Sequence, residues 1–180
     1  MKLKQTMKKI IYLISLSILL SCNQSVKIDT APLSGIINQS DEKTKIVEKL
    51  EKAYTTGIFG LANEYFTPDG VHMVNDVVYT TEEIIKGYNF HSLLFDELKH
   101  NDPYITTMFY NNGNTFTNQW VHLSGVSKIT GQSHELDFYY SWKWGKDKIV
   151  GTHCYFDTRM IEQEAGLFQQ KMADAAGPDQ

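Results

Sequence analysis

The sequence predicts an α+β fold in which three N-terminal helices pack on one face of a mainly antiparallel β-sheet. Two observations support this prediction. From residue 41 to about residue 98, apolar side chains recur three or four positions apart, as along one face of a helix. After Pro103 the pattern changes to alternation with a period of two, which is typical of strands. Helices followed by strands indicate one α+β domain of ordinary size.

The first helix is predicted to follow Ser40 and to end at Gly57. Ser40, Asp41 and Glu42 supply a cap and negative charge at the positive end of the helix dipole. An apolar stripe follows at offsets of 0, 4, 7 and 8, formed by Ile46, Leu50, Ala53 and Tyr54.

Two more helices are predicted on either side of a short strand. Apolar residues between 58 and 65 indicate a short second helix, which ends at the turn sequence Pro68-Asp69-Gly70. The β-branched segment 71–78 predicts the first strand. Thr80 and Glu83 match a capping box, and the third helix then has an apolar face made of Ile84, Tyr88, His91, Phe95 and Leu98.

Four alternating segments predict an antiparallel meander of long strands. Turn residues that accept positive φ separate them, including Gly113, Gly131 and Gly145. The predicted strands are 104–110, 115–126, 135–144 and 148–156.

The N-terminal segment has the layout of a secretory signal. It contains four lysines and no acidic residue, followed by an apolar stretch from Ile10 to Leu20. That stretch is shorter than the roughly 20 apolar residues that cross a bilayer, so a cleaved signal is expected rather than a membrane-spanning helix. Residues 1–21 are assigned to it.

The end of this segment, Leu19-Leu20-Ser21-Cys22, resembles the lipobox of bacterial lipoproteins. The resemblance implies cleavage before Cys22 and attachment of more than one lipid chain to it, as stable anchoring needs. The alternative is an ordinary signal peptide with a chance cysteine. Asn23 and Gln24 follow without an acidic residue, which favours the outer membrane facing the periplasm.

The remaining chain divides into a polar tether over 22–40, a domain over 41–166 and a flexible tail over 167–180. Removing the four signal lysines from the 17 Lys and Arg leaves 13 against 21 Asp and Glu, a net charge of −8. Such a surface argues against nucleic acid as a partner, since nucleic acid selects clustered Lys and Arg.

Neither a cofactor nor a disulfide is predicted. Cys22 and Cys154 are the two cysteines, and lipidation of Cys22 leaves Cys154 without a partner, as a small buried apolar residue. Six histidines have neither His-x-x-x-His nor zinc-ligand spacing with cysteine, and no glycine-rich phosphate loop is present. No metal ligands are therefore assigned.

Several short motifs together resemble the SnoaL-like, nuclear transport factor 2-like superfamily over about residues 43–166. They are Tyr65-Phe66-Thr67-Pro68-Asp69-Gly70-Val71, Gly145-Lys146-Asp147-Lys148-Ile149-Val150, and Tyr155-Phe156-Asp157 with later Gln163 and Gly166. The resemblance implies a strongly curved sheet wrapped around three helices as a cone, with a pocket between them. It also implies that the outer sheet face is a homodimer surface.

Alternation suggests which residues could line that pocket. His153, Tyr155 and Asp157 share one face of the last strand, Trp120 and His122 one face of the second long strand, and Tyr140 and Trp142 one face of the third. If these faces converge, they form an apolar cavity with a few polar groups, the usual composition of a small-molecule site. The predicted ligand-binding set is therefore Trp120, His122, Tyr140, Trp142, His153, Tyr155 and Asp157.

Three functional hypotheses follow from this set. The first is non-catalytic binding of a small, partly apolar molecule. The second is a lyase or isomerase type of enzyme in which Asp157 acts with His153 or His122, because a carboxylate can tune a histidine that titrates near neutrality. The third is a homodimeric assembly or partner-binding module.

Overall fold

The computed structural model describes residues 29–177. All the helices and strands reported below lie in the second of two units into which the chain divides, Ala31–Gln180. The predicted signal peptide and Cys22 lie outside the described residues. Among residues 29–177, no helix combines the length and apolar character that crossing a bilayer requires.

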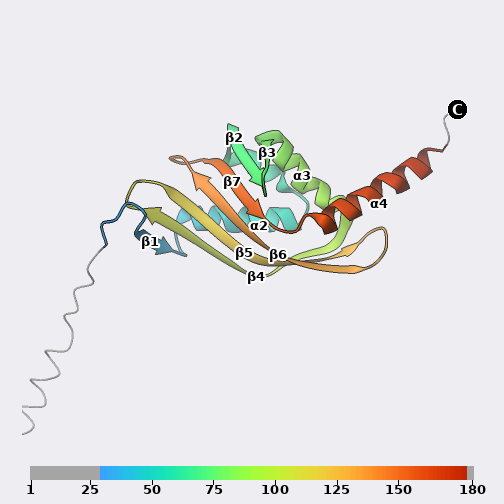
Figure 1. Ribbon diagram of the computed structural model, residues 1–180, viewed down its shortest axis with the longest axis horizontal. Helices are drawn as coiled ribbons and strands as arrows, with labels where there is room; N and C mark the ends of the chain where they lie inside the picture. The colour runs from blue at the N-terminus through green and yellow to red at the C-terminus, as the bar shows by residue number, and fades with distance from the viewer. Residues whose placement is uncertain (1–28, 178–180) are drawn as a thin grey trace, which may run out of the picture. The chain divides into compact units, whose positions relative to one another are not determined.

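A seven-stranded sheet forms the centre of the second unit (Figure 1). The strand order is β1-β4-β5-β6-β7-β2-β3, and every neighbouring pair is antiparallel except β2 with β7. The strands are β1 (Gly35–Asn38), β2 (Phe66–Val74), β3 (Val77–Thr80), β4 (Phe95–Tyr110), β5 (Thr115–Ser127), β6 (Ser133–Trp144) and β7 (Ile149–Tyr155).

The helices pack against this sheet, and the α+β prediction is confirmed. Figure 1 shows α2 and α3 on the same side of the sheet, with α4 extending away from the end of β7. The helices are α2 (Glu42–Thr55), the short 3-10 helix η1 (Phe59–Glu64), α3 (Thr81–Leu94) and α4 (Arg159–Ala176).

The predicted helix starts are also confirmed. The Asp41 side chain caps α2 by accepting hydrogen bonds from the backbone N–H groups of Lys43 and Thr44, at 2.9 and 3.1 Å. Thr80 and Glu83 form the reciprocal capping box of α3. Each cap satisfies backbone donors that the first helical turn leaves unpaired.

Two strands differ from the prediction. Segment 71–78 forms the β2–β3 hairpin rather than one strand, because the chain turns at Asn75, whose φ of 52° suits asparagine better than most residues. Strand β4 begins at Phe95, within the predicted helical stripe, because α3 ends there in extended backbone. Bulges between Asp96 and Lys99 and between Asn101 and Tyr104 interrupt its alternation.

Two elements lie in segments that were assigned to irregular chain. Strand β1 lies in the predicted tether, where all four of its residues are exposed, so it has no burial pattern and is held by backbone pairing with β4. Helix α4 extends through the predicted flexible tail to Ala176. Its contacts with the domain come from its first ten residues, where Glu164 is buried and Phe168 packs on Phe90.

Candidate functional site

The core between the helices and the inner sheet face encloses a cavity of about 40 Å³. Seven Phe, Tyr and Trp side chains line it: Tyr54, Phe59, Tyr88, Phe138, Tyr140, Trp142 and Phe156. Helices α2 and α3 supply Tyr54 and Tyr88, and β6 supplies three rings at alternate positions. Since a water molecule needs at least about 10–15 Å³, the cavity has room for a few waters or a small group.

Partly exposed side chains mark the mouth of this cavity. Phe138, Phe156 and Ile161 line it and are only half-buried, as is Glu51. The other end is closed by fully packed residues such as Trp142. A molecule larger than a few atoms therefore has to displace side chains at the mouth, where Ile161 comes from α4.

Three polar side chains in the lining have buried nitrogen atoms without a hydrogen-bond partner among the described residues. They are Nε2 of Gln119, Nε1 of Trp142 and Nε2 of His100. Gln119 is 1% exposed, Trp142 2%, and the His100 side chain 3%. The buried Tyr88 hydroxyl interacts with the Tyr140 hydroxyl and the Cys154 thiol. The wall of the cavity itself is almost entirely apolar, so the cavity suits a small apolar group.

His100 is held in place by two contacts. Its Nδ1 lies 3.1 Å from Oε1 of Glu51, and its ring stacks on Tyr54 at a centroid distance of 5.2 Å. A carboxylate can only accept, so Nδ1 is the protonated nitrogen of this pair. Its Nε2 is buried and has no hydrogen-bond partner among the described residues.

The deeper titratable groups of the cavity are held in their neutral forms. Burial lowers the pKa of His91 to about 4, and its Nδ1 lies 2.9 Å from the Tyr54 hydroxyl. Burial raises the pKa of the Cys154 thiol to about 12 and that of Tyr54 and Tyr140 above the usual value. Cys154 is thus a buried thiol, as predicted.

The structure separates the seven predicted ligand-binding residues. Tyr140 and Trp142 line the cavity, whereas Trp120, His122, His153, Tyr155 and Asp157 do not. The cause is the register of β5 and β6: Gln119 lies opposite Tyr140, and Trp120 lies opposite Tyr139. Directly opposed residues share a face, so Trp120 and His122 lie on the outer face. The expectation that all seven converge on one cavity is corrected accordingly.

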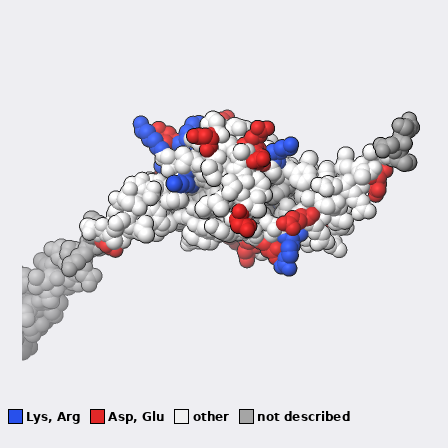
Figure 2. Space-filling view, turned by 45° about the horizontal axis from the view of Figure 1, so that its top comes forward, with Lys and Arg blue, Asp and Glu red and all other residues white. Residues whose placement is uncertain are grey.

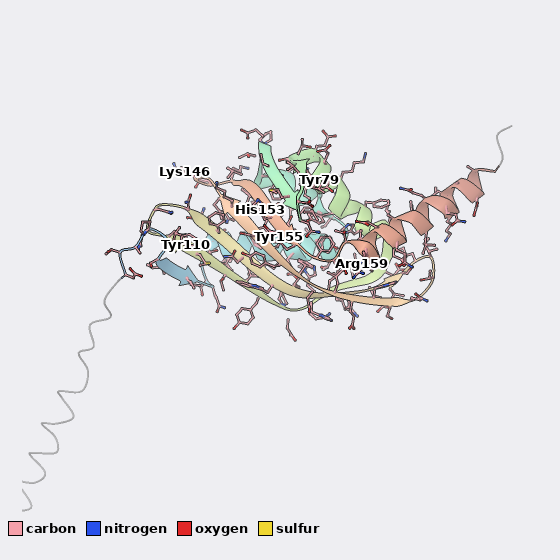
Figure 3. All side chains as sticks on the ribbon, viewed as in Figure 1. Tyr79, Tyr110, Lys146, His153, Tyr155 and Arg159 are labelled. Carbon is pink, nitrogen blue, oxygen red and sulfur yellow. The ribbon has the colours of Figure 1, made fainter. Side chains whose placement is uncertain are left out.

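The three predicted acid/base residues have separate surroundings. His122 Nδ1 lies 2.7 Å from Asp137, and this hydrogen bond raises the pKa of His122. Asp157 is hydrogen-bonded by Arg159 at the start of α4, which lowers the pKa of Asp157 to about 2. Figure 3 shows His153 beside Tyr155 on β7 and Arg159 on α4. No hydrogen bond joins the three in residues 29–177.

The outer face has its own shallow groove. Trp120 and Tyr155, 46% and 48% exposed, lie on either side of Tyr139, with centroid distances of 5.3 and 6.3 Å. Tyr104 and the His122–Asp137 pair complete this outer aromatic groove. Unlike the cavity, it is open to solvent along its length.

Charged side chains do not form a continuous basic patch on the face shown in Figure 2, where Lys and Arg alternate with Asp and Glu. Within the part of the chain that the structure describes, no three His, Cys, Asp or Glu side chains come close enough to hold a metal ion.

Sequence reasoning missed Glu51, His100 and Gln119 as cavity residues. His100 lies between two bulges of β4, where the alternation of side chains does not predict which face of the sheet a residue occupies. Its contact with Glu51 joins residues 49 positions apart in the sequence. Gln119 lies on the opposite face of β5 from Trp120 and His122, the two residues of this strand that were predicted to bind a ligand. One signal was available, because a glutamine among the apolar inward positions Val121 and Leu123 is unusual.

No family model and no curated protein matches the sequence, but solved structures share its architecture. AclR from Streptomyces galilaeus, a proposed hydroxylase, has a TM-score of 0.57 at 14% identity, covering 69% of this chain and 96% of its own. IdmH from Streptomyces antibioticus, a proposed polyketide cyclase, has a TM-score of 0.54 at 14% identity, covering 70% and 99%.

A third neighbour is a nuclear transport factor 2-like protein of unknown function from Burkholderia pseudomallei. Its TM-score is 0.52 at 12% identity, with 68% of this chain and 96% of that chain covered. At such identities the similarity concerns the fold. The chain therefore has the nuclear transport factor 2-like, or SnoaL-like, fold.

Proposed function

We propose that this protein is a lipid-anchored envelope protein whose domain binds a small, partly apolar molecule in the aromatic cavity without transforming it. The observation that supports binding is the cavity itself, which lies in the core and is lined mainly by aromatic side chains, with His100 and Gln119 among its lining residues. Aromatic walls with a few polar groups that fix orientation are typical of small-molecule sites. Two neighbours of the same fold are described as proposed polyketide cyclases and a third as a proposed isomerase.

Non-catalytic binding has more support than catalysis by the predicted residues. His122, His153 and Asp157 lie outside the cavity, and Asp157 is engaged by Arg159. A general acid or base must come within hydrogen-bond reach of the reacting group. These three residues do not meet that condition for a molecule held in the cavity.

Native mass spectrometry tests binding. The chain would be purified from cell envelopes under mild conditions, and we expect a discrete added mass that is lost on denaturation. Leu136→Trp, at the half-buried mouth, should reduce the bound fraction by filling the entrance, while Trp120→Ala on the outer face should retain it. A wild-type chain without any added mass would argue against the cavity as a binding site. So would a bound molecule that the Leu136 variant retains and the Trp120 variant loses.

The lipid anchor is a separate part of the proposal and rests on the lipobox resemblance at Leu19-Leu20-Ser21-Cys22. Cys22→Ala should abolish fatty-acid labelling and leave the precursor uncut, whereas Cys154→Ala should leave both unchanged. Fatty-acid labelling of the Cys22 variant would show that the anchor is wrongly assigned.

The outer aromatic groove favours a second role as a homodimer or partner surface. Exposed apolar patches on soluble domains are often interaction sites, and Tyr104, Trp120 and Tyr155 are all exposed there. Dimer peaks in the same mass spectra that disappear in a Trp120→Ser, Tyr155→Ser double variant would support this role. Monomer peaks at all accessible concentrations would contradict it.

A further inference from the structure

We infer that the outer aromatic groove binds an extended, arginine-containing segment of a partner protein, whose guanidinium groups stack on the rings of the groove and pair with its carboxylates. This inference rests on the second role proposed above for the groove and adds the chemistry of the partner. It follows from the register of four strands, from the hydrogen bonds already made inside the groove, and from the charges that line it.

One row of aromatic side chains crosses four adjacent strands of the sheet. Tyr104 of β4 pairs with Trp120 of β5, Trp120 with Tyr139 of β6, and Tyr139 with Tyr155 of β7. Directly paired residues point to the same face of a sheet, and strands about 4.8 Å apart make the row roughly 14 Å long. Because Tyr104, Trp120 and Tyr155 are exposed on the outer face, a partner can reach the rings along the whole row.

Several hydrogen-bond donors of the groove are already used by the protein itself. The Tyr139 hydroxyl donates to Oδ1 of Asn118 at 2.5 Å. His122 Nδ1 donates to Asp137 at 2.7 Å, and the Asn101 amide donates to the backbone carbonyl of His122 at 3.2 Å. A carboxylate has about four acceptor sites, so Asp137 can accept further bonds. The groove therefore presents mainly acceptors and ring faces, which favours a partner rich in donors.

The charges of the groove select a cation. Asp102 and Asp137 line it, and among the described residues of the lining none is Lys or Arg. Glu135 lies on the same face of β6, and its carboxylate is 3.5 Å from His122 Nε2. The side chains of Asp137 and Glu135 are 86% and 68% exposed, so a partner can reach both. Even when His122 is protonated, three carboxylates outnumber it, and the groove attracts positive charge.

The same charges disfavour other occupants of the groove. In a two-fold dimer a surface meets itself, so Asp102 and Asp137 would face carboxylates of the second copy, with no Lys or Arg of the described lining between them. Like charges that face each other weaken an interface. A neutral glycan would gain the ring faces but would leave the carboxylates without a counter-ion. A basic protein segment uses both features.

Arginine matches this surface better than lysine does. Its guanidinium is planar, carries five donors and no acceptor, and stacks on aromatic faces while it pairs with a carboxylate. In an extended segment, alternate side chains point to the same side, roughly 7 Å apart at about 3.4 Å per residue. The ring centroids of Trp120 and Tyr139 are 5.3 Å apart, and those of Tyr139 and Tyr155 are 6.3 Å apart. Two arginines separated by one residue can therefore stack on neighbouring rings.

Isothermal titration calorimetry on the full chain, purified from cell envelopes in a non-ionic detergent, tests the inference. The probe is an acetylated and amidated pentapeptide in which two arginines alternate with three glycines. Matched peptides carry citrulline, which is planar but uncharged, or lysine, which is charged but not planar, in place of both arginines. We expect the citrulline and lysine peptides each to bind about tenfold more weakly than the arginine peptide. Equal affinities of the three peptides would overturn the inference.

Variants of the groove assign each preference to its residue. Asp137→Asn should weaken the arginine peptide about tenfold and bring its affinity close to that of the citrulline peptide. Glu162→Gln, which removes an exposed carboxylate on α4 away from the groove, should leave the affinity unchanged. Trp120→Ser should reduce the advantage of arginine over lysine, and Trp120→Phe should retain part of it. Unchanged affinities in folded Asp137 and Trp120 variants would contradict the assignment to this groove.

Two further measurements separate failure of this inference from failure of the proposed role of the groove. If the arginine peptide does not bind but the Trp120→Ser, Tyr155→Ser variant loses a dimer, the groove joins two copies and the partner chemistry is wrong. If N-acetylchitotriose binds and the arginine peptide does not, the partner is a glycan and the inference is again wrong. If neither probe binds and the wild-type chain is monomeric, both the inference and the role of the groove are overturned.

Discussion

At the scale of single residues, the buried polar groups of the inner sheet face fall into two kinds. The Thr117 hydroxyl contacts the Thr107 hydroxyl at 2.8 Å and accepts a hydrogen bond from Trp144 Nε1 at 2.8 Å, so it joins β4, β5 and β6. The Gln119 amide, two residues along the same strand, has a nitrogen without a protein partner. The first group therefore stabilises the fold through hydrogen bonds, whereas no protein hydrogen bond depends on the Gln119 nitrogen.

This difference predicts opposite responses to removing the polar group. Thr117→Val should lower the free energy of unfolding by about 1 to 3 kcal/mol, because it leaves Trp144 and Thr107 short of a partner. Gln119→Leu should leave that free energy unchanged or raise it by up to about 1 kcal/mol, since no protein hydrogen bond of its Nε2 is lost. Urea denaturation measures both. An equal loss in the two variants would show that Gln119 is structural.

His72 predicts a loss of stability in acid. It is fully buried between the hydroxyls of Thr152 and Thr81, 2.9 and 3.1 Å away, and burial lowers its pKa from 6.5 to about 4. The unfolded chain therefore binds this proton first as the pH falls. Neutral His72 therefore contributes fully to the free energy of unfolding above pH 6.5. This contribution declines as the pH falls toward 4, by a total on the order of 3 kcal/mol.

Denaturation at pH 7.5 and pH 4.5 checks this prediction. His72→Gln should reduce the difference in unfolding free energy between the two pH values, and the matched exposed variant His153→Gln should preserve it. The prediction would be contradicted if the wild-type unfolding free energy were the same at both pH values. It would also be contradicted if His72→Gln left the difference between the two pH values unchanged.

At the scale of elements, the parallel pairing of β2 and β7 depends on a close backbone approach at Gly151. A Cβ atom there would lie 2.5 Å from the Val71 carbonyl oxygen. Gly151→Ala should therefore lower the unfolding free energy by about 2 kcal/mol or more. Gly87 lies at an exposed position of α3, and a Cβ atom added there would have no neighbouring atom within 4 Å. Gly87→Ala should therefore raise the unfolding free energy by roughly 0.5 to 1 kcal/mol.

Thermal unfolding of these two glycine variants measures the contrast. If Gly151→Ala is as stable as the wild-type chain, β2 and β7 do not approach each other as closely as the structure shows.

Helix α4 is held to the sheet by a buried carboxylate. Glu164 accepts a hydrogen bond from Ser127 Oγ at 2.5 Å, and its other oxygen lies 3.1 Å from His134 Nε2. Because α4 also places Ile161 at the cavity mouth, Glu164→Ala should loosen the helix and speed ligand release. The loss in stability should be about 2 to 3 kcal/mol, while exposed Glu162→Ala should have little effect.

Hydrogen exchange of backbone amides in 159–168 checks this prediction. Faster exchange in the Glu164 variant than in the Glu162 variant is expected. Equal exchange in the two variants would mean that Glu164 does not anchor α4.

The elements differ in how far the sequence predicts them. Helices α2 and α3 were predicted from caps and apolar stripes, which are local signals at Asp41 and Thr80. Strand β1 and the first half of β4 were missed, because β1 exposes every side chain and β4 is bulged. Such strands are defined by backbone pairing with residues far along the chain.

At the scale of the whole molecule, the α+β class follows from element order, which the sequence shows, and the nuclear transport factor 2-like fold was predicted from a resemblance in that order and in short motifs. The cavity does not follow in the same way. Alternation assigns Tyr140 and Trp142 to one face of β6 and Trp120 to one face of β5, but only the register shows that these faces are opposite sides of the sheet. Register depends on turn geometry and on total packing, so the site needed the structure.

The central claim is that the inner cavity, rather than the outer aromatic groove, is the small-molecule site. A crystal structure of the chain purified from its own cell envelope, without denaturation, tests this most directly. We expect a bound molecule in the inner cavity, in contact with Tyr54, Tyr88 and Tyr140. A molecule bound over Trp120 and Tyr155, with the inner cavity filled by protein side chains alone, would contradict it.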